Sequence, residues 1–383
     1  MVLCWELRLV SKLLPSLYVD AECFVRSFGG VAKATWWLYN AFCPRYADEF
    51  NVYALRRGEP LQQPLPQGMH DFPIGNFPLR DLWRATIIPP FSYLPQVQAI
   101  HFPNNGRIPF GISAPPFQSK GITTLHDVLP LEVEGYLSPE KRKRYIQKTQ
   151  RYIHQSAFVM TVSDYSKAQI LRQIHRPQGI VVIPNAPTLT SLGDKRPLLL
   201  EASKPYFLYT GRYEPRKGID VAIRAMLDLH HAGELTSALW ITGKVKYFSA
   251  DFERLVKEAT AQGIVKELGY VSDLELATLM HESRALIYPS RSEGFGLPPL
   301  EAMTQGCPVI TTRLTAIPEA CGEAVLYVNP DDLNDVKQAI LALERNASQR
   351  IDLIEKGFQQ ARRFSWDASA DIFAEALRQH LFH

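Results

Sequence analysis

Short apolar runs alternate with amphipathic stretches through most of the chain, a pattern that is typical of β-α-β-α folds. In the first half, the apolar runs predict strands over 17–24, 50–55, 120–126, 157–162 and 179–184. The amphipathic stretches predict helices over 32–42, 140–155 and 163–173. Residues 57–118 are rich in proline and predict only short strands among loops. The first half therefore predicts a parallel, doubly wound sheet.

The same alternation restarts in the second half, after residues 185–204 have interrupted it. The predicted strands cover 206–210, 239–242, 265–270, 285–288, 307–312 and 324–328, and the predicted helices cover 218–230, 250–262, 273–281 and 333–345. We therefore expect an extension at 1–16, a first domain at 17–190, a linker at 191–204 and a second domain at 205–365. Ligands bind such sheets beyond the carboxyl ends of the strands, so we expect the site in the mouth between the domains.

Length and composition narrow the class of protein. A chain of 383 residues suits two domains of about 150–200 residues each. The net charge of +3 is too small to indicate a nucleic-acid partner. The five cysteines are scattered and odd in number, without any C-x-x-C pair. They argue against a disulfide framework and a zinc site, and they predict a reducing, cytoplasmic location.

A membrane-spanning helix is not expected, because no apolar run approaches about 18 residues. The N-terminal segment is apolar but interrupted by Glu6, Arg8 and Lys12. This pattern argues against a secretory signal and leaves a docked extension or an interfacial helix. The basic stretch 141–151 is typical of a solvated helix face, and the anionic inner face of a membrane is its alternative partner.

The most informative segment is 291–303, which reads RSEGFGLPPLEAM. Its two adjacent prolines suit the first turn of a helix, and Gly306 suits the end of that helix. Glu293 then precedes the helix N-terminus, and Glu301 lies within its first turns. Free backbone N–H groups at such an end bind anions, so we expect an anion with a hydroxyl-binding carboxylate on each side. A nucleotide sugar has that shape.

A second polar segment, TGRYEPRKG at 210–218, follows a predicted strand and opens a helix. Arg212 can grip phosphate oxygens as a fork, and Lys217 adds a point charge. Two cations here could neutralise a leaving diphosphate without a divalent metal. The alternative is a solvated basic turn. The segment is neither a Walker loop nor a dinucleotide-binding fingerprint.

Weaker observations complete the set of candidates. Gly29-Gly30 follows the first strand, where a loop without Cβ atoms allows a ligand to approach the backbone, although a plain turn fits equally. His126 ends a strand, and a purely structural histidine is its alternative. Glu293 and Glu301 could instead be the acid and base of a glycosidase, but neither has an obvious neighbour that would tune its proton. No carboxylate pair has a convincing D-x-D arrangement, so no metal site is expected.

Together these segments resemble the family 4 retaining glycosyltransferases, which have the GT-B fold of two Rossmann-like domains facing across a cleft. The resemblance runs from about residue 17 to about residue 381 and is most specific in EGFGLPPLEAM and YTGRYEPRKG. Weaker matches are FGGVAKAT, TLHDVLPL, VSDYSK, LGYVSDLEL and IPEACGEAVLYVNPDD. Within the family, the chain resembles most the bacterial mannosyltransferases of polysaccharide assembly.

The resemblance implies transfer of a hexose, mannose from GDP-mannose, to a glycan or lipid-linked acceptor, without a metal or other cofactor. The catalytic candidates that it implies are His126, Arg212, Lys217 and Glu293. The donor-binding candidates are Gly29, Gly30, Gly294, Phe295, Gly296, Leu297 and Glu301. In this family the two cations hold the diphosphate, the first glutamate contacts the donor sugar and the second binds the ribose hydroxyls. The histidine lies near the reacting carbon.

Two positions depart from the family's pattern. Lys217-Gly218 replaces the usual Lys-Asn, which we expect to matter little, and Asn185-Ala186-Pro187 replaces the usual turn after a strand. The family's last helix packs back on the first domain, and we expect 366–383 to do the same. Three alternatives stay open: a UDP-sugar-dependent transferase of the same fold, a sugar-nucleotide epimerase, and a non-catalytic partner that binds nucleotide sugars.

Overall fold

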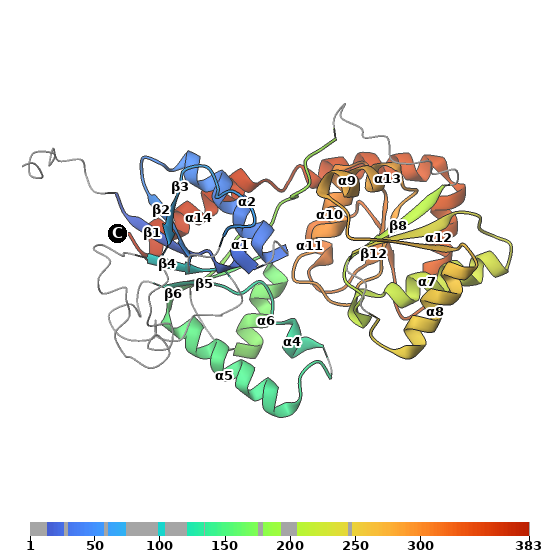
Figure 1. Ribbon diagram of the computed structural model, residues 1–383, viewed down its shortest axis with the longest axis horizontal. Helices are drawn as coiled ribbons and strands as arrows, with labels where there is room; N and C mark the ends of the chain where they lie inside the picture. Colours follow the sequence, from blue (N-terminus) through green and yellow to red (C-terminus); the bar gives the residue numbers. More distant parts are fainter. Residues whose placement is uncertain are drawn as a thin grey trace, which may run out of the picture.

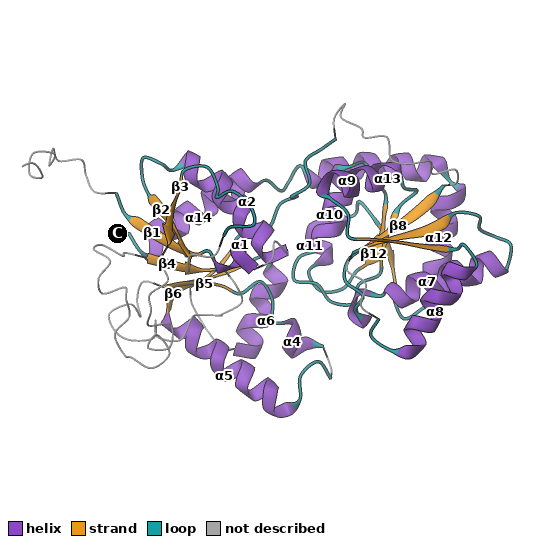
Figure 2. Ribbon diagram, viewed as in Figure 1, coloured by secondary structure: helices purple, strands orange, loops and turns teal. Residues whose placement is uncertain are grey.

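Two α/β domains lie side by side, each with a central parallel sheet and helices on both of its faces (Figure 1 and Figure 2). This computed structural model describes residues 14–26, 30–56, 60–73, 99–103, 121–133, 135–174, 179–192, 205–243 and 247–382. Within these residues, each domain has apolar clusters packed against its sheet. The expectation of two doubly wound parallel sheets is confirmed.

The sheet of the first domain has the strand order β3-β2-β1-β4-β5-β6-β7, and its described pairs are parallel. The strands are β1 (Ser16–Asp20), β2 (Asn51–Arg56), β3 (Met69–Pro73), β4 (Ala99–Phe102), β5 (Gly121–Thr124), β6 (Ser156–Thr161) and β7 (Ile180–Val182). The helices are α1 (Glu22–Arg26), α2 (Gly30–Arg45), α4 (Leu129–Glu132), α5 (Pro139–Gln155) and α6 (Asp164–Ile174). Sequence periodicity therefore placed most of these elements correctly.

The first strand is shorter than predicted, because the chain turns at Asp20. The Asp20 carboxylate accepts a hydrogen bond from the backbone N–H of Glu22 at 3.2 Å, the local bond by which aspartate initiates turns. The apolar residues that follow form α1 instead of extending the strand, and Phe24 is buried in the core of the first domain.

The sheet of the second domain has the order β10-β9-β8-β11-β12-β13. The strands are β8 (Tyr206–Thr210), β9 (Ala238–Thr242), β10 (Val265–Gly269), β11 (Leu286–Tyr288), β12 (Val309–Thr312) and β13 (Leu326–Val328). The helices are the 3₁₀ turn η2 (Pro215–Lys217), α7 (Ile219–His231), α8 (Ala250–Ala261), α9 (Asp273–Glu282), α10 (Leu297–Thr304), α11 (Ile317–Cys321), α12 (Leu333–Arg345) and α13 (Ala347–Ala361). Of the α-helices, α11 and α13 were not predicted. Helix α13 follows α12 with no strand between them, because Asn346 accepts the N–H of Gln349 at 3.0 Å and caps a new helix.

The last helix, α14 (Trp366–His380), lies on the first domain against α2 (Figure 1). Phe373 and Leu377 are fully buried in the core of that domain. Asp371 accepts hydrogen bonds from Arg45 at 2.8 Å and from Tyr46 at 2.7 Å. The chain therefore returns to the first domain after completing the second.

The two passages of the chain between the domains are tied to each other. The Trp366 indole N–H donates to the carbonyl oxygen of Pro187 at 3.0 Å. Ser369 donates to the carbonyl oxygen of Pro184 at 2.6 Å. These bonds hold the outgoing segment, which includes the unusual Asn185-Ala186-Pro187 sequence, against the start of α14.

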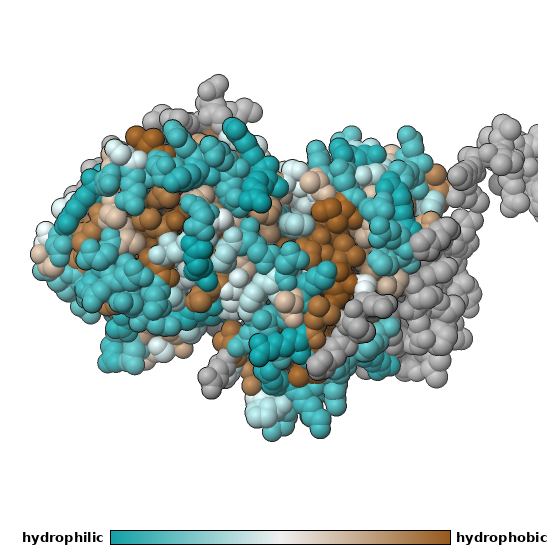
Figure 3. Space-filling view, turned by 180° about the vertical axis from the view of Figure 1, so that it is seen from behind, coloured by the Kyte–Doolittle hydropathy of each residue, from teal (hydrophilic) through white to brown (hydrophobic). Residues whose placement is uncertain are grey.

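The back face of the molecule is mostly hydrophilic, and hydrophobic residues form separate patches on each of the two lobes (Figure 3). Large apolar side chains that stand exposed, such as Tyr270 and Leu274, are scattered along the chain, as is normal for a folded domain. Among the described residues, no helix combines the length and the apolar character that crossing a bilayer requires.

Candidate active site

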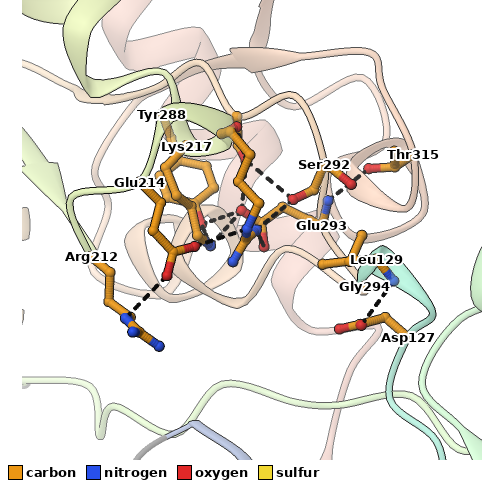
Figure 4. A network of polar contacts seen from close by, with 12 residues as sticks. Asp127, Leu129, Arg212, Glu214, Lys217, Tyr288, Ser292, Glu293, Gly294 and Thr315 are labelled. Carbon is orange, nitrogen blue, oxygen red and sulfur yellow. Dashed lines mark hydrogen bonds and ion pairs between the residues drawn. The ribbon is translucent and has the colours of Figure 1, made fainter. Parts of the chain in front are cut away.

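Glu293 is the centre of a buried polar cluster on the loop that follows β11 (Figure 4). It is only 7% exposed. Its Oε1 accepts hydrogen bonds from Lys217 Nζ at 2.5 Å, Tyr288 OH at 2.7 Å and Ser290 Oγ at 2.7 Å. Its backbone N–H donates to Thr315 Oγ1 at 3.0 Å, and Thr315 has a left-handed backbone with φ 54°. Such strain persists where surrounding contacts hold it, and here it accompanies the loop that carries Glu293.

The turn after β8 brings Lys217 to this cluster, and a glycine makes the approach possible. Gly218 follows the 3₁₀ turn with φ 68°. A Cβ atom at position 218 would lie 2.2 Å from the carbonyl oxygen of Pro289, so any other residue would push the turn away from the end of β11. The departure at Lys217-Gly218, which we expected to matter little, therefore has a packing reason.

Arg216 is a member of this cluster that sequence analysis missed. Its Nη1 donates to the carbonyl oxygen of Ser292 at 2.7 Å and lies 3.7 Å from Glu293 Oε2. Its Nε pairs with Glu214 at 2.9 Å, and its own carbonyl oxygen accepts the N–H of Arg291 at 2.7 Å. The side chain is 18% exposed, so it is held rather than solvated. The sequence did contain a signal for its role, because Arg216 is a cation directly adjacent to Lys217.

Burial and ion pairing act in opposite directions on these groups. Burial alone would raise the pKa of Glu293, but Lys217 and Arg216 outweigh it and hold that pKa below its usual range. Burial lowers the pKa of Lys217, against the opposing effect of Glu293. Burial alone would also lower the pKa of Arg216, and the carboxylates of Glu293 and Glu214 raise it. Glu293 is therefore an ionised carboxylate, and the expectation that no neighbour tunes its proton is wrong.

Arg212 lies outside the cluster, at its rim (Figure 4). Its side chain is 75% exposed, and its Nε pairs with Glu214 at 3.2 Å. The segment 210–218 is thus divided into a solvated arginine at its start and a buried lysine at its end. The alternative of a solvated basic turn fits Arg212 in this structure and does not fit Lys217.

Glu301 is buried on α10, where it is 8% exposed. Its Oε1 accepts hydrogen bonds from the hydroxyl of Thr188 at 2.5 Å and from the backbone N–H of Thr188 at 3.4 Å. Burial raises the pKa of Glu301, while Thr188 and the nearby Lys33 lower it. Lys33 belongs to α2 of the first domain and pairs with Asp273 at the start of α9. Both predicted carboxylates are therefore buried.

The first domain meets this site at the glycine that follows Glu293. A Cβ atom at Gly294 would lie 3.1 Å from Asp127 Oδ2 and 3.2 Å from the carbonyl oxygen of His126. The carbonyl oxygen of Gly294 accepts hydrogen bonds from the hydroxyls of Ser163 at 2.8 Å and Ser166 at 3.2 Å. Glycine at 294 therefore permits a close contact between the domains beside the carboxylate.

His126 and Asp127 lie at this contact and are partly buried. They follow β5, which ends at Thr124 and not at His126 as predicted. His126 Nε2 lies 3.0 Å from the carbonyl oxygen of Pro103, and burial lowers the pKa of His126. Asp127 Oδ1 accepts the N–H of Leu129 at 3.2 Å, and burial raises the pKa of Asp127. The structure thus brings the predicted His126 to the loop of Glu293 and adds Asp127 as a second carboxylate there.

The other predicted donor-binding residues are divided between the loop and the core. Phe295 is 5% exposed and belongs to the hydrophobic core of the second domain. Gly296 precedes α10 with a left-handed backbone, and Leu297 is the first residue of that helix. Gly29 lies outside the described residues. Gly30 begins α2, and a Cβ atom there would meet no described protein atom within 4 Å. The predicted approach of a ligand to this glycine stays a prediction.

Comparison with known proteins identifies the family. Residues 204–346 match the family model described as glycosyl transferases group 1. O-antigen chain mannosyltransferase B of Escherichia coli is 33% identical over 262 residues, which cover 65% of this chain and 67% of that protein. The chain belongs to the group 1 glycosyl transferases.

Two further likenesses place this glycosyl transferase among its relatives. The serotype-specific mannosyltransferase WbdA of Escherichia coli is 28% identical over 324 residues, which cover 79% of this chain and only 38% of WbdA. The structure of HepE from Anabaena, solved in complex with UDP and glucose, matches with a TM-score of 0.69 at 16% identity. That match covers 96% of this chain and 100% of HepE, and it confirms the GT-B fold.

In this glycosyl transferase, α10 and the loop before it carry or contact charged groups of both signs. Lys217 and Arg216 supply buried cations beside α10, whose N-terminal N–H groups favour anions. Glu293 and Glu301 supply carboxylates that can accept hydrogen bonds from hydroxyl groups. Within the described part of the chain, no group of His, Cys, Asp and Glu side chains could hold a metal ion.

Proposed function

We propose that this glycosyl transferase moves mannose from GDP-mannose to a glycan or lipid-linked acceptor, with retention of the anomeric configuration. The observation that carries the proposal is the buried contact between Lys217 and Glu293 beside the N-terminus of α10. One such site can bind a diphosphate through the cation and a sugar through the carboxylate. The relatives named mannosyltransferases support mannose as the donor sugar. HepE, solved with UDP and glucose, supports a nucleotide-sugar donor and makes a UDP-sugar the alternative.

The charged groups suit the departure of a nucleoside diphosphate. In the proposed reaction, the bond between the sugar's C1 and the diphosphate oxygen breaks, and the acceptor oxygen bonds to C1 from the same face. The acceptor's proton passes to the departing phosphate. Lys217, the N–H groups at the start of α10 and Arg212, once it has left Glu214, would stabilise the charge on the leaving group.

The carboxylates would position the two sugars of the donor. Glu293 lies next to the domain contact and would hold the transferred sugar, with His126 near its reacting carbon. Glu301, deeper along α10, would accept hydrogen bonds from the ribose hydroxyls, for which Thr188 is the present donor. The assignment explains why two carboxylates are buried at one site, since each would exchange a protein hydroxyl for a substrate hydroxyl.

We propose that these protein cations act in place of a divalent metal. Two positive side chains and a helix N-terminus supply the charge stabilisation that a metal otherwise provides to a leaving diphosphate. The expected result is that the initial rate of transfer persists in excess EDTA. Loss of activity in EDTA, followed by recovery on addition of Mg²⁺ or Mn²⁺, would show that this part of the proposal is wrong.

The acceptor side includes a strongly basic helix. The exposed residues of α5 include Lys141, Lys143, Arg144, Lys148 and Arg151, and the one acidic residue of the helix, Glu140, lies in its first turn. We propose that this face rests on an anionic membrane surface, where a lipid-linked acceptor would be found. Sedimentation with vesicles tests it: binding should require anionic lipid and decrease when these five residues are replaced by glutamine. Equal binding to neutral vesicles would contradict the assignment.

The deciding experiment is a donor panel followed by product analysis. Thermal unfolding is measured with GDP-mannose, UDP-glucose and other GDP- and UDP-sugars, because a ligand at about a hundredfold excess over its Kd stabilises the fold by about 2.7 kcal/mol. The stabilising donor is then incubated with an acceptor extract, and the anomeric configuration of the product is read by NMR. We expect stabilisation by GDP-mannose and an α-mannoside as product. Conversion of the donor without any acceptor would favour an epimerase, and binding without transfer would favour a non-catalytic partner.

A further inference from the structure

Arg216 is held in a way that separates it from the other two cations of its segment. Arg212 is largely solvated, and Lys217 makes its shortest contacts with Glu293 and Tyr288. The guanidinium of Arg216 instead contacts the backbone carbonyl of Ser292 and the carboxylate of Glu214, which leaves little freedom for the side chain. A planar guanidinium with several fixed contacts aligns the groups around it.

The two oxygens of Glu293 have different partners. Oε1 accepts the hydrogen bonds of Lys217, Tyr288 and Ser290, whereas Oε2 lies 3.7 Å from Arg216. If Lys217 turns to bind a diphosphate, Oε1 shares or loses its closest cation. A buried carboxylate that loses its counter-ion binds a proton or moves toward water. Arg216 is the buried cation that stays beside Glu293 in that event.

We propose that Arg216 is a positioning residue for the transfer reaction, which keeps Glu293 ionised and in place while Lys217 is engaged by the donor diphosphate. This inference rests on the proposed function, because it requires Lys217 to bind the donor. Arg216 acts through Glu293 and the Ser292 carbonyl and does not itself hold the diphosphate. Removal of Arg216 should therefore lower the rate of sugar transfer without changing the affinity for the nucleotide.

The charged groups around Glu293 determine in which direction the pKa of its carboxyl group shifts when Arg216 is removed. Lys217 and Arg216 favour its ionised form, while Asp127 of the first domain opposes it. Tyr288 of β11 and Tyr209 of β8 also face it, and burial raises the pKa of both phenols, so they stay neutral. Removal of Arg216 takes away one of the two favourable charges. The acid limb of the pH–rate profile should then move to higher pH.

The experiment compares Arg216→Met, Arg216→Lys and Lys217→Met with the full-length protein, after thermal unfolding has shown that each variant is folded. Binding of GDP, which lacks the sugar, is measured by calorimetry, and kcat and KM for transfer are measured across pH. Arg345→Met is the matched control, because it removes the same charge from an exposed pair with Glu234. Its pH profile should coincide with that of the unmodified protein.

For Arg216→Met we expect GDP affinity to change by less than about twofold, and kcat/KM to fall roughly tenfold more at about pH 5 than at about pH 8. Arg216→Lys keeps the charge and should restore most of the pH profile, whereas Lys217→Met should weaken GDP binding. The inference is overturned if Arg216→Met transfers sugar with an unchanged profile, or if it loses GDP binding as Lys217→Met does. The inference is also overturned if kcat/KM of Arg216→Lys falls as much at low pH as that of Arg216→Met. Absence of transfer from every GDP- and UDP-sugar by the unmodified protein would instead reject the proposed function.

Discussion

Lys217 and Glu293 are 76 positions apart in the sequence and form a buried ion pair, with 2.5 Å between Nζ and Oε1. Their side chains are 12% and 10% exposed. Removing one partner of such a pair typically costs about 3–5 kcal/mol, because the other charge stays buried without compensation. The pair therefore links the turn after β8 to the loop after β11 and places a cation and a carboxylate at one point before any substrate arrives.

The first prediction concerns the cation of that pair. Lys217→Ala should lower kcat roughly a hundredfold or more, since one preorganised donor at a developing negative charge typically contributes about 3–4 kcal/mol. Initial rates of transfer at saturating donor measure the effect. Lys337→Ala is the control, because Lys337 of α12 forms a solvent-accessible pair with Asp228 of α7 and has no contact with Glu293 among the described ion pairs. Unchanged turnover in Lys217→Ala would show that Lys217 does not stabilise the charge on the leaving group.

Stability and catalysis can be separated at this pair. Lys217→Ala should also lower the unfolding temperature, because Glu293 loses its closest cation and keeps the more distant Arg216, at 3.7 Å, as its counter-ion. The double variant Lys217→Met/Glu293→Gln contains no charge at either position and should recover most of that stability without recovering turnover. If the double variant remained as unstable as the single one, the loss would come from packing rather than from charge.

Local sequence signals predicted the elements that carry the site. Glu293 and Glu301 were placed correctly relative to α10, because prolines in a first turn and a terminal glycine act on the backbone next to them. The strand at 206–210 was also predicted with the right bounds, since a buried parallel strand is a continuous apolar run. Where a local bond competed with the apolar pattern, as at Asp20, the prediction was wrong.

The partners of the site residues could not be predicted, because they come from distant parts of the chain. Thr188 lies 113 positions from Glu301, and the contact exists only because the outgoing segment passes α10. The low exposure of Arg216 and the high exposure of Arg212 have a similar cause. Which cation of the segment is buried depends on how the 3₁₀ turn meets Pro289, and no spacing within the segment records that contact.

The second prediction concerns the solvated arginine. Arg212→Ala should weaken GDP binding about tenfold or more, because a hydrogen bond to a charged group contributes about 1.5–3 kcal/mol. The unfolding temperature without nucleotide should not change, since the exposed pair with Glu214 contributes about 0–1 kcal/mol. Calorimetry with GDP and thermal unfolding test the two parts. Arg254→Ala, which breaks a comparably exposed pair with Asp251, should change neither. Unaltered GDP affinity in Arg212→Ala would show that Arg212 stays at the rim when the nucleotide binds.

The third prediction concerns Asp127, the partly buried carboxylate of the first domain that lies against Gly294. Burial raises the pKa of Asp127, against the opposing Leu129 N–H and the charges of His126 and Arg216. A carboxyl group whose pKa is higher in the folded than in the unfolded state weakens the fold once the pH exceeds both values. Asp127→Asn should therefore raise the unfolding temperature near pH 7.5 by roughly 2–4 °C, the shift that about 1 kcal/mol produces in a domain of about 150–250 residues. The gain should disappear as the pH falls through the raised pKa, where Asp127 itself becomes neutral.

Asp371 provides the control with the opposite sign. Hydrogen bonds from Tyr46 and Arg45 lower its pKa, so its contribution to stability is present above the unfolded pKa and is lost as the pH falls through the folded one. Asp371→Asn should lower the unfolding temperature near pH 7.5. If both variants shifted the temperature in the same direction, the sign assigned to one of the two carboxylates would be wrong.

The fourth prediction concerns the glycine at which the domains meet. Gly294 is not among the described glycines with a left-handed backbone, so alanine fits its own conformation. Its methyl group, however, would lie 3.0 Å from Asp127 Cβ and 3.2 Å from the His126 carbonyl oxygen, and the domains would have to separate to admit it. Gly294→Ala should therefore lower kcat roughly ten- to a hundredfold, because a shift of about 1 Å between reacting groups is costly.

Two measurements distinguish this separation from a general loss of structure in Gly294→Ala. Small-angle X-ray scattering with GDP present should give a larger radius of gyration than for the unmodified protein, while the unfolding temperature stays nearly the same. Ser166→Ala removes one of the hydroxyl bonds to the Gly294 carbonyl oxygen without adding volume, so it should have the smaller effect on kcat. A Gly294→Ala protein with normal kcat would mean that transfer proceeds with the domains further apart than they are here. The contact of Asp127 with the loop of Glu293 would then have no part in the reaction.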